Sequence, residues 1–170
     1  MTNDQPQKLP LEGVRVAGVT VVWAGPHVTQ LLAEWGADVI RVEPMNRIQP
    51  YSRLSLQPQS ANVQQLMAQG GLTYALTPDL DPGPDPWNRS AAFNSHARNK
   101  RSMTCDITSP DGHAAFLKLI ENVDVLVENN VPVTIEKAHI TYEELRAVNP
   151  RLIMLRMPAF GLDGPYKNFR

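Results

Sequence analysis

The side chains that could perform catalysis are spread along the sequence without a recognisable catalytic arrangement. Four histidines are present, none at metal-ligand spacing from another: His27, His96, His113 and His139. The G-x-S-x-G motif of a serine nucleophile is absent. Cys105 lies in a predicted strand, which favours a small buried residue over a reactive thiol. Asp163 lies in a glycine-flanked turn, where aspartate forms local hydrogen bonds. We therefore predict no catalytic residue and no metal site in this chain.

Basic residues gather just before the third predicted strand. Arg98, Lys100 and Arg101 place three cations within four positions, and Arg41 lies near the end of the second predicted strand. Such groups bind phosphate oxygens through charge-assisted hydrogen bonds, so they suit a phosphate-bearing ligand at a sheet edge. A solvated loop is the other interpretation of the cluster, and the sequence leaves both open.

The turn after the first predicted strand carries Trp23, Ala24 and Gly25 ahead of Pro26. Small residues there let a ligand approach the backbone, and the start of the following helix offers free amides to an anion. An ordinary strand-to-helix turn explains the same residues. The single glycine does not match the G-x-G-x-x-G fingerprint of NAD-binding domains, which leaves a nucleotide-binding Rossmann domain as a remote alternative.

Polar residues also follow the fourth predicted strand. Asn129 and Asn130 come directly after it, and Lys137 follows within a turn or two. Paired asparagines at such a position can form hydrogen bonds with a nucleotide or a pantetheine amide, or they can close the turn. The sequence leaves both roles open.

The hydrophobic pattern predicts the elements that position these residues. Short β-branched or apolar runs predict five strands, at residues 14–22, 38–43, 101–107, 123–128 and 152–157. Three helices are predicted between these strands. The first has Pro26 at its first position and Gly36 as its cap, and its apolar face contains Val28, Leu31, Leu32 and Trp35. The second begins at Pro110, and the third follows the capping box Thr141–Glu144.

Alternating strands and helices define the α/β class, here a Rossmann-like, open and mostly parallel sheet with helices on both faces. In such sheets ligands bind at the carboxyl ends of the strands. Residues 1–10 are predicted as a flexible lead, and 11–170 as an α/β domain interrupted by an irregular, proline-rich insert at 44–92. Seven of the fifteen prolines lie between Pro44 and Pro86.

Composition narrows the class of protein further. A chain of 170 residues is long enough for one buried core, and its formal net charge of -1 gives no reason to expect nucleic acid as a partner. The single cysteine predicts a reducing, cytoplasmic location. The polar first residues do not resemble a signal peptide, and no apolar run approaches the ~20 residues that span a membrane.

Together these segments resemble the family III CoA-transferases, a group that includes formyl-CoA transferase, carnitine CoA-transferase and methylacyl-CoA racemase. The matching motifs are LEGVRV (11–16), AGPHVTQLLA (24–33), GADVIRVEP (36–44), NKRS (99–102), SPDG (109–112), VDVLVEN (123–129), LRAVNPRLI (145–153) and FGLDGPY (160–166). The resemblance covers nearly all of residues 9–170 except the insert.

The resemblance implies a domain that binds coenzyme A, within a longer chain whose two copies interlock into a dimer like linked rings. It places Trp23 and Ala24 beside the adenosine moiety, and Arg41, Arg98, Lys100 and Arg101 near the phosphates. It places the following residues along the rest of the ligand: Cys105, Asp106, Asn129, Asn130 and Lys137. Lys137 stands where many members have arginine, and Pro44 stands where some have an arginine that contacts coenzyme A.

The resemblance also implies a reaction that these residues do not complete. In family III transferases an aspartate attacks the acyl thioester, and coenzyme A passes between carboxylic acids through a covalent enzyme thioester. We expect that aspartate to lie beyond Arg170, so the isolated chain is expected to be inactive. The alternative is a non-catalytic half-enzyme or partner subunit that associates with a full-length relative. The acyl-CoA and the acid are not specified by the sequence.

Overall fold

The computed structural model describes residues 8–44 and 86–169, which form one parallel sheet with helices on both of its faces. The sheet contains β1 (Arg15–Val19), β2 (Asp38–Glu43), β3 (Lys100–Thr104), β4 (Val125–Glu128) and β5 (Ile153–Arg156). Each neighbouring pair of strands is parallel. The order β3-β2-β1-β4-β5 confirms the predicted Rossmann-like α/β class.

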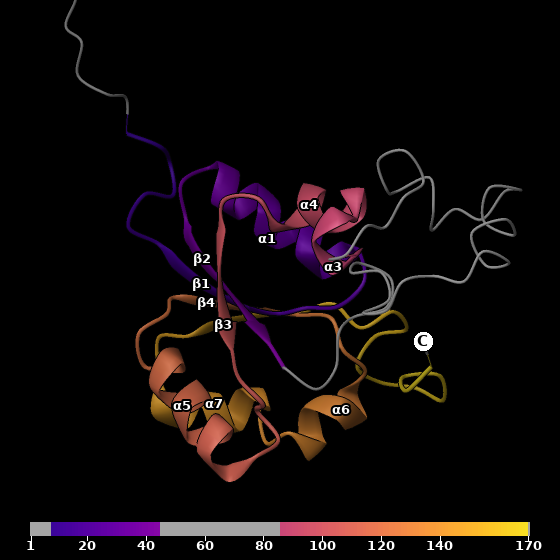
Figure 1. Ribbon diagram of the computed structural model, residues 1–170. Helices are drawn as coiled ribbons and strands as arrows, with labels where there is room; N and C mark the ends of the chain where they lie inside the picture. Colours follow the sequence, from indigo (N-terminus) through magenta and orange to yellow (C-terminus); the bar gives the residue numbers. More distant parts are fainter. Residues whose placement is uncertain (1–7, 45–85, 170) are drawn as a thin grey trace, which may run out of the picture.

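Helices lie on both sides of this sheet. One layer contains α1 (Ala24–Glu34), α3 (Pro86–Arg89) and α4 (Ala91–Ala97), and the other contains α5 (Pro110–Ile120), α6 (Pro132–Lys137) and α7 (Tyr142–Val148) (Figure 1). Because the chain winds outward from β1 in both directions, the strand order reverses between β1 and β4. The loops after these two strands diverge there and leave room for a ligand.

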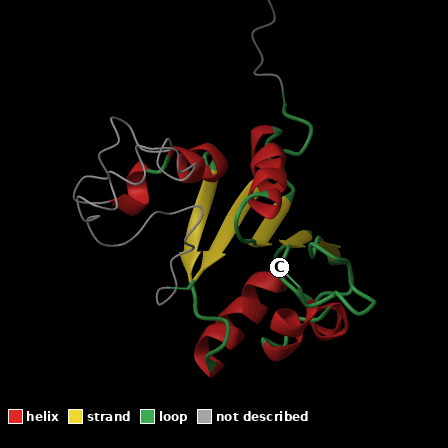
Figure 2. Cartoon of the chain, turned by 90° about the vertical axis from the view of Figure 1, so that its right-hand side faces the viewer, coloured by secondary structure: helices red, strands yellow, loops and turns green. Residues whose placement is uncertain are grey.

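Two apolar clusters hold the layers together. The larger lies between the sheet and α5–α7 and includes the fully buried Phe116, Ile120 and Leu126. The smaller lies beneath α1 and includes Val16, Val39 and Val127. Figure 2 shows the sheet between these helical layers. Burial of β-branched residues on both faces explains why the strands appear as continuous apolar runs in the sequence.

Several helix ends follow the predicted capping chemistry. Ser109 caps α5 by accepting from the Gly112 amide, with Pro110 in the first turn. Thr141 and Glu144 form the capping box of α7. Gly36 follows α1 with a φ of +100°, a left-handed conformation that glycine adopts without strain.

Other boundaries and faces differ from the predictions. α1 begins at Ala24, which puts Pro26 at its third position, and β3 ends at Thr104. Leu31 and Trp35, on the predicted apolar face of α1, are 43% and 57% exposed, because the helix packs through Thr29, Gln30 and Ala33.

The predicted lead at 1–10 and insert at 44–92 lie largely outside the described residues, which omit 1–7 and 45–85. The end of the predicted insert is helical: it contains α3 and the first residues of α4. Ser90 caps α4 by accepting from the Phe93 amide, a short signal that the surrounding proline-rich composition obscures.

Candidate functional site

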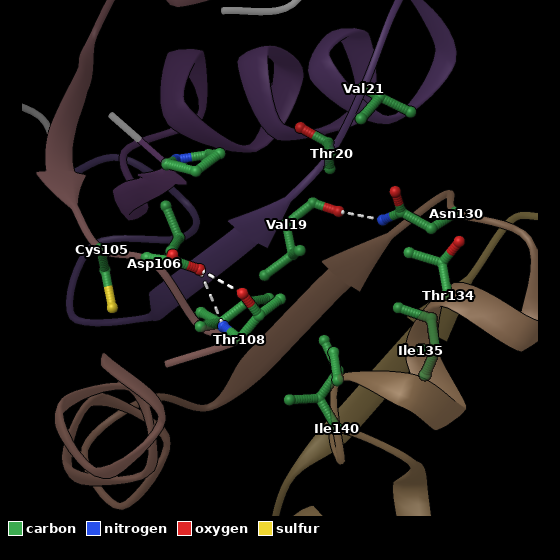
Figure 3. A pocket seen from close by; sticks show the side chains of 14 residues that line it. Val19, Thr20, Val21, Cys105, Asp106, Thr108, Asn130, Thr134, Ile135 and Ile140 are labelled. Atoms are coloured by element: carbon green, nitrogen blue, oxygen red, sulfur yellow. Dashed lines mark hydrogen bonds between the residues drawn. The ribbon is translucent and has the colours of Figure 1, made fainter. Parts of the chain in front are cut away.

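A cavity of about 520 Å³ opens at the carboxyl edge of the sheet. Its walls come from the loop after β1, from residues 105–108 after β3, and from α6 with the turn that follows it. Figure 3 shows Val19 and Thr20 on one side, Cys105, Asp106 and Thr108 on another, and Asn130, Thr134 and Ile135 opposite. The cavity therefore lies where the strand order predicts a ligand.

The loop after β1 is held in place by Asn129. The side-chain Oδ1 of Asn129 accepts from the Val21 amide at 2.8 Å, and its Nδ2 donates to the Val21 carbonyl at 2.9 Å. The next residue, Val22, has a φ of 60°, which a β-branched residue adopts only under strong constraint. Asn129 therefore closes the turn after β1, which is one of the two roles that the sequence leaves open for it.

Asn130 joins the same loop to the cavity wall. Its Nδ2 donates to the Val19 carbonyl at 2.8 Å, and its backbone amide donates to the carboxylate of Glu128 at 2.8 Å. Glu128 is fully buried and accepts from Arg156 Nε at 2.9 Å. A buried carboxylate needs such partners, so the exit of β4 is a rigid polar junction.

The segment after β3 provides the polar part of the cavity. Asp106 Oδ1 accepts from the Thr108 hydroxyl at 2.6 Å and from the Thr108 amide at 3.0 Å, and these bonds lower the pKa of the Asp106 carboxyl. The Cys105 thiol donates to the Gly112 carbonyl at 3.1 Å. Burial, with a smaller effect of the Asp106 charge, raises the pKa of Cys105. Asp106 is therefore an ionised acceptor, whereas Cys105 is an unreactive thiol.

Arg41 and Lys100 lie in the layer between the sheet and the helices α1 and α4. Arg41 is 4% exposed, pairs with Glu43 at 2.7 Å and lies 5.2 Å from the centre of the Phe93 ring. The Lys100 Nζ donates to the Pro26 carbonyl and to Thr29 Oγ1, both at 2.7 Å. Neither residue lines the cavity.

The remaining two cations of the basic cluster lie at the opposite, amino-terminal edge of the sheet. Arg98 pairs with Glu34 at 2.7 Å, and Arg101 donates from Nε to Asp38 at 2.9 Å. Asp38 begins β2, so its ion pair with Arg101 is remote from the strand exits. The structure does not bring Arg98, Lys100 and Arg101 together at the cavity.

The other predicted site residues do not line the cavity. Trp23 is 55% exposed just before α1, with its ring centre 4.5 Å from that of His96, and Ala24 follows it as the first residue of the helix. Lys137 is exposed at the end of α6, next to Ala138, which lines the cavity.

Sequence reasoning missed much of the wall. The unpredicted lining residues are Val19, Thr20, Val21, Val42, Pro44, Ile107, Thr108, Thr134, Ile135, Ala138 and Ile140. Most are apolar side chains that resemble any core residue in the sequence. The useful signal was position immediately after a strand, which applies to Pro44, directly after the strand 38–43.

Within residues 8–44 and 86–169, no group of three or more histidine, cysteine, aspartate or glutamate side chains is placed to hold a metal ion. Across the same residues, no helix is long and apolar enough to cross a membrane.

The cavity and strand order define an α/β domain with a candidate ligand site at the carboxyl edge of its sheet, and comparison with known proteins identifies its family. The sequence model of CoA-transferase family III matches residues 11–170, so the chain belongs to that family. The chain is 34% identical over 168 residues to the succinyl-CoA–D-citramalate CoA-transferase of Chloroflexus aurantiacus, covering 99% of this chain and 35% of that protein. It is also 34% identical over 161 residues to a succinyl-CoA–L-malate CoA-transferase alpha subunit of Chloroflexus aurantiacus, covering 95% of this chain and 32% of that subunit.

Solved structures give the same result. A CAIB/BAIF family protein from Brucella suis superimposes with a TM-score of 0.69 and 32% identity, covering 96% of this chain and 37% of that one. The chain thus spans about a third of the length of the relatives that it matches.

Proposed function

We propose that this chain is the coenzyme-A-binding, amino-terminal part of an acyl-CoA:carboxylate CoA-transferase. The observation that carries the proposal is the cavity at the carboxyl edge of the sheet, next to the reversal of strand order between β1 and β4. The loops that form it belong to the segment that matches the family.

The lining of the cavity suits the nucleoside end of coenzyme A. Ile107, Ile135 and Ile140 supply apolar surface for a flat base, and a volume of about 520 Å³ is ample for adenosine. The ionised Asp106 can accept hydrogen bonds from ribose hydroxyl groups. Lys137, on the exposed end of the adjoining helix, supplies a cation for phosphate without the bidentate grip of arginine.

On this arrangement the rest of the ligand follows the edge of the sheet towards Trp23 and Ala24, where α1 begins. Free amides in the first turn of that helix favour an anionic or carbonyl group. Arg41 contributes a buried positive charge behind this turn. The first-turn residues therefore complete the proposed binding surface, whereas Arg98 and Arg101 do not belong to it.

We place the nucleophilic aspartate in the part of the relatives that this chain does not match. Asp106 lines the cavity and accepts from Thr108, and Glu128, which ends β4 and does not line the cavity, is buried and accepts from Arg156. Neither carboxylate is therefore available as a free nucleophile. The expected chemistry of the complete enzyme, attack of an aspartate on an acyl thioester, therefore requires residues from outside this chain, and the chain alone is expected to bind coenzyme A without transferring it.

Calorimetric titration with coenzyme A tests the binding proposal. Thr134→Trp should fill the cavity and abolish the binding heat, whereas the double variant Arg98→Ala/Arg101→Ala should bind like the wild type. Circular dichroism and thermal unfolding would confirm that both variants fold. Retained binding in Thr134→Trp together with loss in the double variant would refute the cavity and favour the basic cluster.

A second candidate function is association with a larger CoA-transferase chain as a non-catalytic subunit. Ile153 and Leu155 on the edge strand β5 are 63% and 40% exposed, and Leu31 and Trp35 on α1 are exposed as well. Parallel sheets are normally covered on both faces, so this apolar surface favours a protein partner. The naming of relatives as alpha and beta subunits is consistent with hetero-oligomers.

Size-exclusion chromatography with light scattering distinguishes the two candidates, with or without a co-expressed full-length relative. A monodisperse monomer that never co-elutes with the relative would contradict the subunit function. An interlocked homodimer would require additional sequence.

A cytoplasmic location accords with the single, buried cysteine.

A further inference from the structure

The first turn of α1 is fixed to the sheet by a lysine from β3. Lys100 Nζ donates to the carbonyl of Pro26 and to the hydroxyl of Thr29, both at 2.7 Å. Thr29 Oγ1 lies 3.0 Å from the Pro26 carbonyl and 3.2 Å from the Gly25 carbonyl, and it donates back to the helix. A connected set of hydrogen bonds therefore joins β3 to residues 25–29.

The same turn is fixed from the other side by β4. Gly25 packs so closely that a Cβ there would lie 2.6 Å from Asn129 Oδ1 and 2.8 Å from Thr20 Cβ. Asn129 in turn holds both backbone groups of Val21. Between these two attachments lie Val22 and Trp23, which precede α1, and Ala24, its first residue, at the edge of the proposed site.

We propose that Lys100 is a positioning residue that holds the β1–α1 turn, residues 20–26, in the geometry that receives coenzyme A. It acts through Pro26 and Thr29 and does not touch the ligand. The proposal rests on the proposed function for its ligand, whereas its structural part, the attachment of α1 to β3, stands by itself. It gives Lys100 a role different from the phosphate contact that the sequence suggests.

The environment of Lys100 makes this attachment sensitive to pH. Burial, and then the nearby positive charge of Arg41, lower the pKa of Lys100 to about 7. The elements packed around it carry these further titratable or charged groups: Glu43 on β2, His27 and Glu34 on α1, His96 on α4 and Arg98 at its end. Burial lowers the pKa of His96, so this histidine does not add a second full charge at neutral pH.

Because burial disfavours the ammonium form, Lys100 binds a proton less readily in the attached state than when it is hydrated. The attachment should therefore become more favourable as the pH rises through about 7, and the neutral amine can still donate two hydrogen bonds.

The binding test compares coenzyme A affinity in Lys100→Met with that in Arg101→Met, a control that removes the neighbouring cation from the remote ion pair with Asp38. Lys100→Met should weaken binding about tenfold, the equivalent of about 1.4 kcal/mol and within the range for lost charged hydrogen bonds, whereas Arg101→Met should change it less than about twofold. The ratio of wild-type to Lys100→Met affinity should rise between pH 6 and pH 8.5. In Lys100→Arg, which keeps its charge, the ratio should stay constant. Equal affinities for Lys100→Met and wild type, or a ratio independent of pH, would overturn the proposal.

Amide hydrogen exchange provides the structural test without a ligand. Protection of α1 residues near Thr29 should fall in Lys100→Met and in Thr29→Val, a milder change that removes only the hydroxyl, and should stay at the wild-type level in Arg101→Met. If the wild type does not bind coenzyme A but protection falls as expected, the proposed ligand is wrong and the attachment is real. Unchanged protection in Lys100→Met and Thr29→Val overturns the attachment itself.

Discussion

Replacing Gly25 with alanine places a methyl group where the first turn of α1 meets β1 and β4. The new Cβ would lie 2.6 Å from Asn129 Oδ1 and 2.8 Å from both Cβ and Cγ2 of Thr20. Thr20 is 3% exposed, so it has little room to move away. Asn129 could move only by releasing its hydrogen bonds to Val21. The substitution should therefore displace α1 or break this contact between Asn129 and the β1–α1 turn.

Two effects of opposite sign determine the size of the change. Alanine is favoured over glycine in a helix by up to about 1 kcal/mol. Overpacking a tight site typically costs about 1–3 kcal/mol, and an unmade buried hydrogen bond adds to it. We expect the cost of overpacking to exceed the gain in helix propensity, so that the free energy of unfolding falls by about 1–2 kcal/mol.

Gly18→Ala is the matched control, because the nearest atom to its Cβ would be Thr29 Cγ2, at 3.4 Å, followed by Cγ2 and Oγ1 of Thr20 at 3.9 Å. That distance is ordinary van der Waals contact, so the unfolding free energy should change by less than about 0.5 kcal/mol. Urea titration followed by far-ultraviolet circular dichroism measures both variants at equal protein concentration. A Gly25→Ala protein at least as stable as the wild type would show that the approach of α1 to Asn129 is not tight, and would refute the reasoning.

Three further predictions concern other parts of the structure. Thr141→Ala should destabilise the chain by about 1 kcal/mol through loss of the α7 capping box, and Thr141→Ser should restore most of it, as measured by urea unfolding. Glu128→Leu should cost about 3 kcal/mol in the same assay, because it leaves Arg156 and the Asn130 amide without their shared acceptor at a buried junction. A loss below about 1 kcal/mol would show that the junction is already solvated. For Lys100, the folded pKa of about 7 lies below the ordinary 10.5, so the unfolded chain binds more protons between these values and stability should rise with pH across this interval. The difference in unfolding free energy between wild type and Lys100→Met should therefore change in favour of the wild type from pH 7 to pH 10, and a constant difference would contradict the lowered pKa.

The fold was largely predictable because its signals are local. The central strands β1, β2 and β4 are short, mainly apolar runs that are largely buried, and α5 and α7 begin with Ser109 and Thr141 in capping arrangements that sequence spacing reveals. α6 gave no such signal: its cap is Val131, which makes no side-chain hydrogen bond, and the helix contains six residues. The inward face of α1 was predicted in part: Val28 and Leu32 pack against the core beneath the helix, whereas Leu31 and Trp35 are exposed. The polar Thr29 is buried instead, where it accepts from Lys100 of β3, a contact that helical periodicity does not reveal.

The candidate site was predictable in location but not in the roles of its residues. Asn129 and Asn130 were identified by their place after β4, yet their partners lie more than a hundred residues earlier, at Val19 and Val21. Arg98 and Arg101 are close to Lys100 in sequence, but their side chains meet carboxylates at the other edge of the sheet. Alternation along β3 sends Lys100 and Arg101 to opposite faces, so the adjacent cations of the cluster cannot converge on one ligand.

The polar residues around the β1–α1 turn therefore form hydrogen bonds with its backbone in the absence of any ligand. Asn129 secures the β1–α1 turn from β4, and Lys100 secures the same turn from β3, so the turn is supported on both sides of β1. The cavity beside it is lined mainly by apolar groups with few polar contacts, among which Asp106 is ionised. This division of roles explains why the family motifs of this segment combine small residues with hydrogen-bonding ones: glycine permits the close approach at Gly25, and amide and ammonium groups hold it. It follows that substitutions at Asn129 or Lys100 should weaken coenzyme A binding by loosening the turn, whereas substitutions at Thr134 should do so by occupying the cavity while the turn stays fixed.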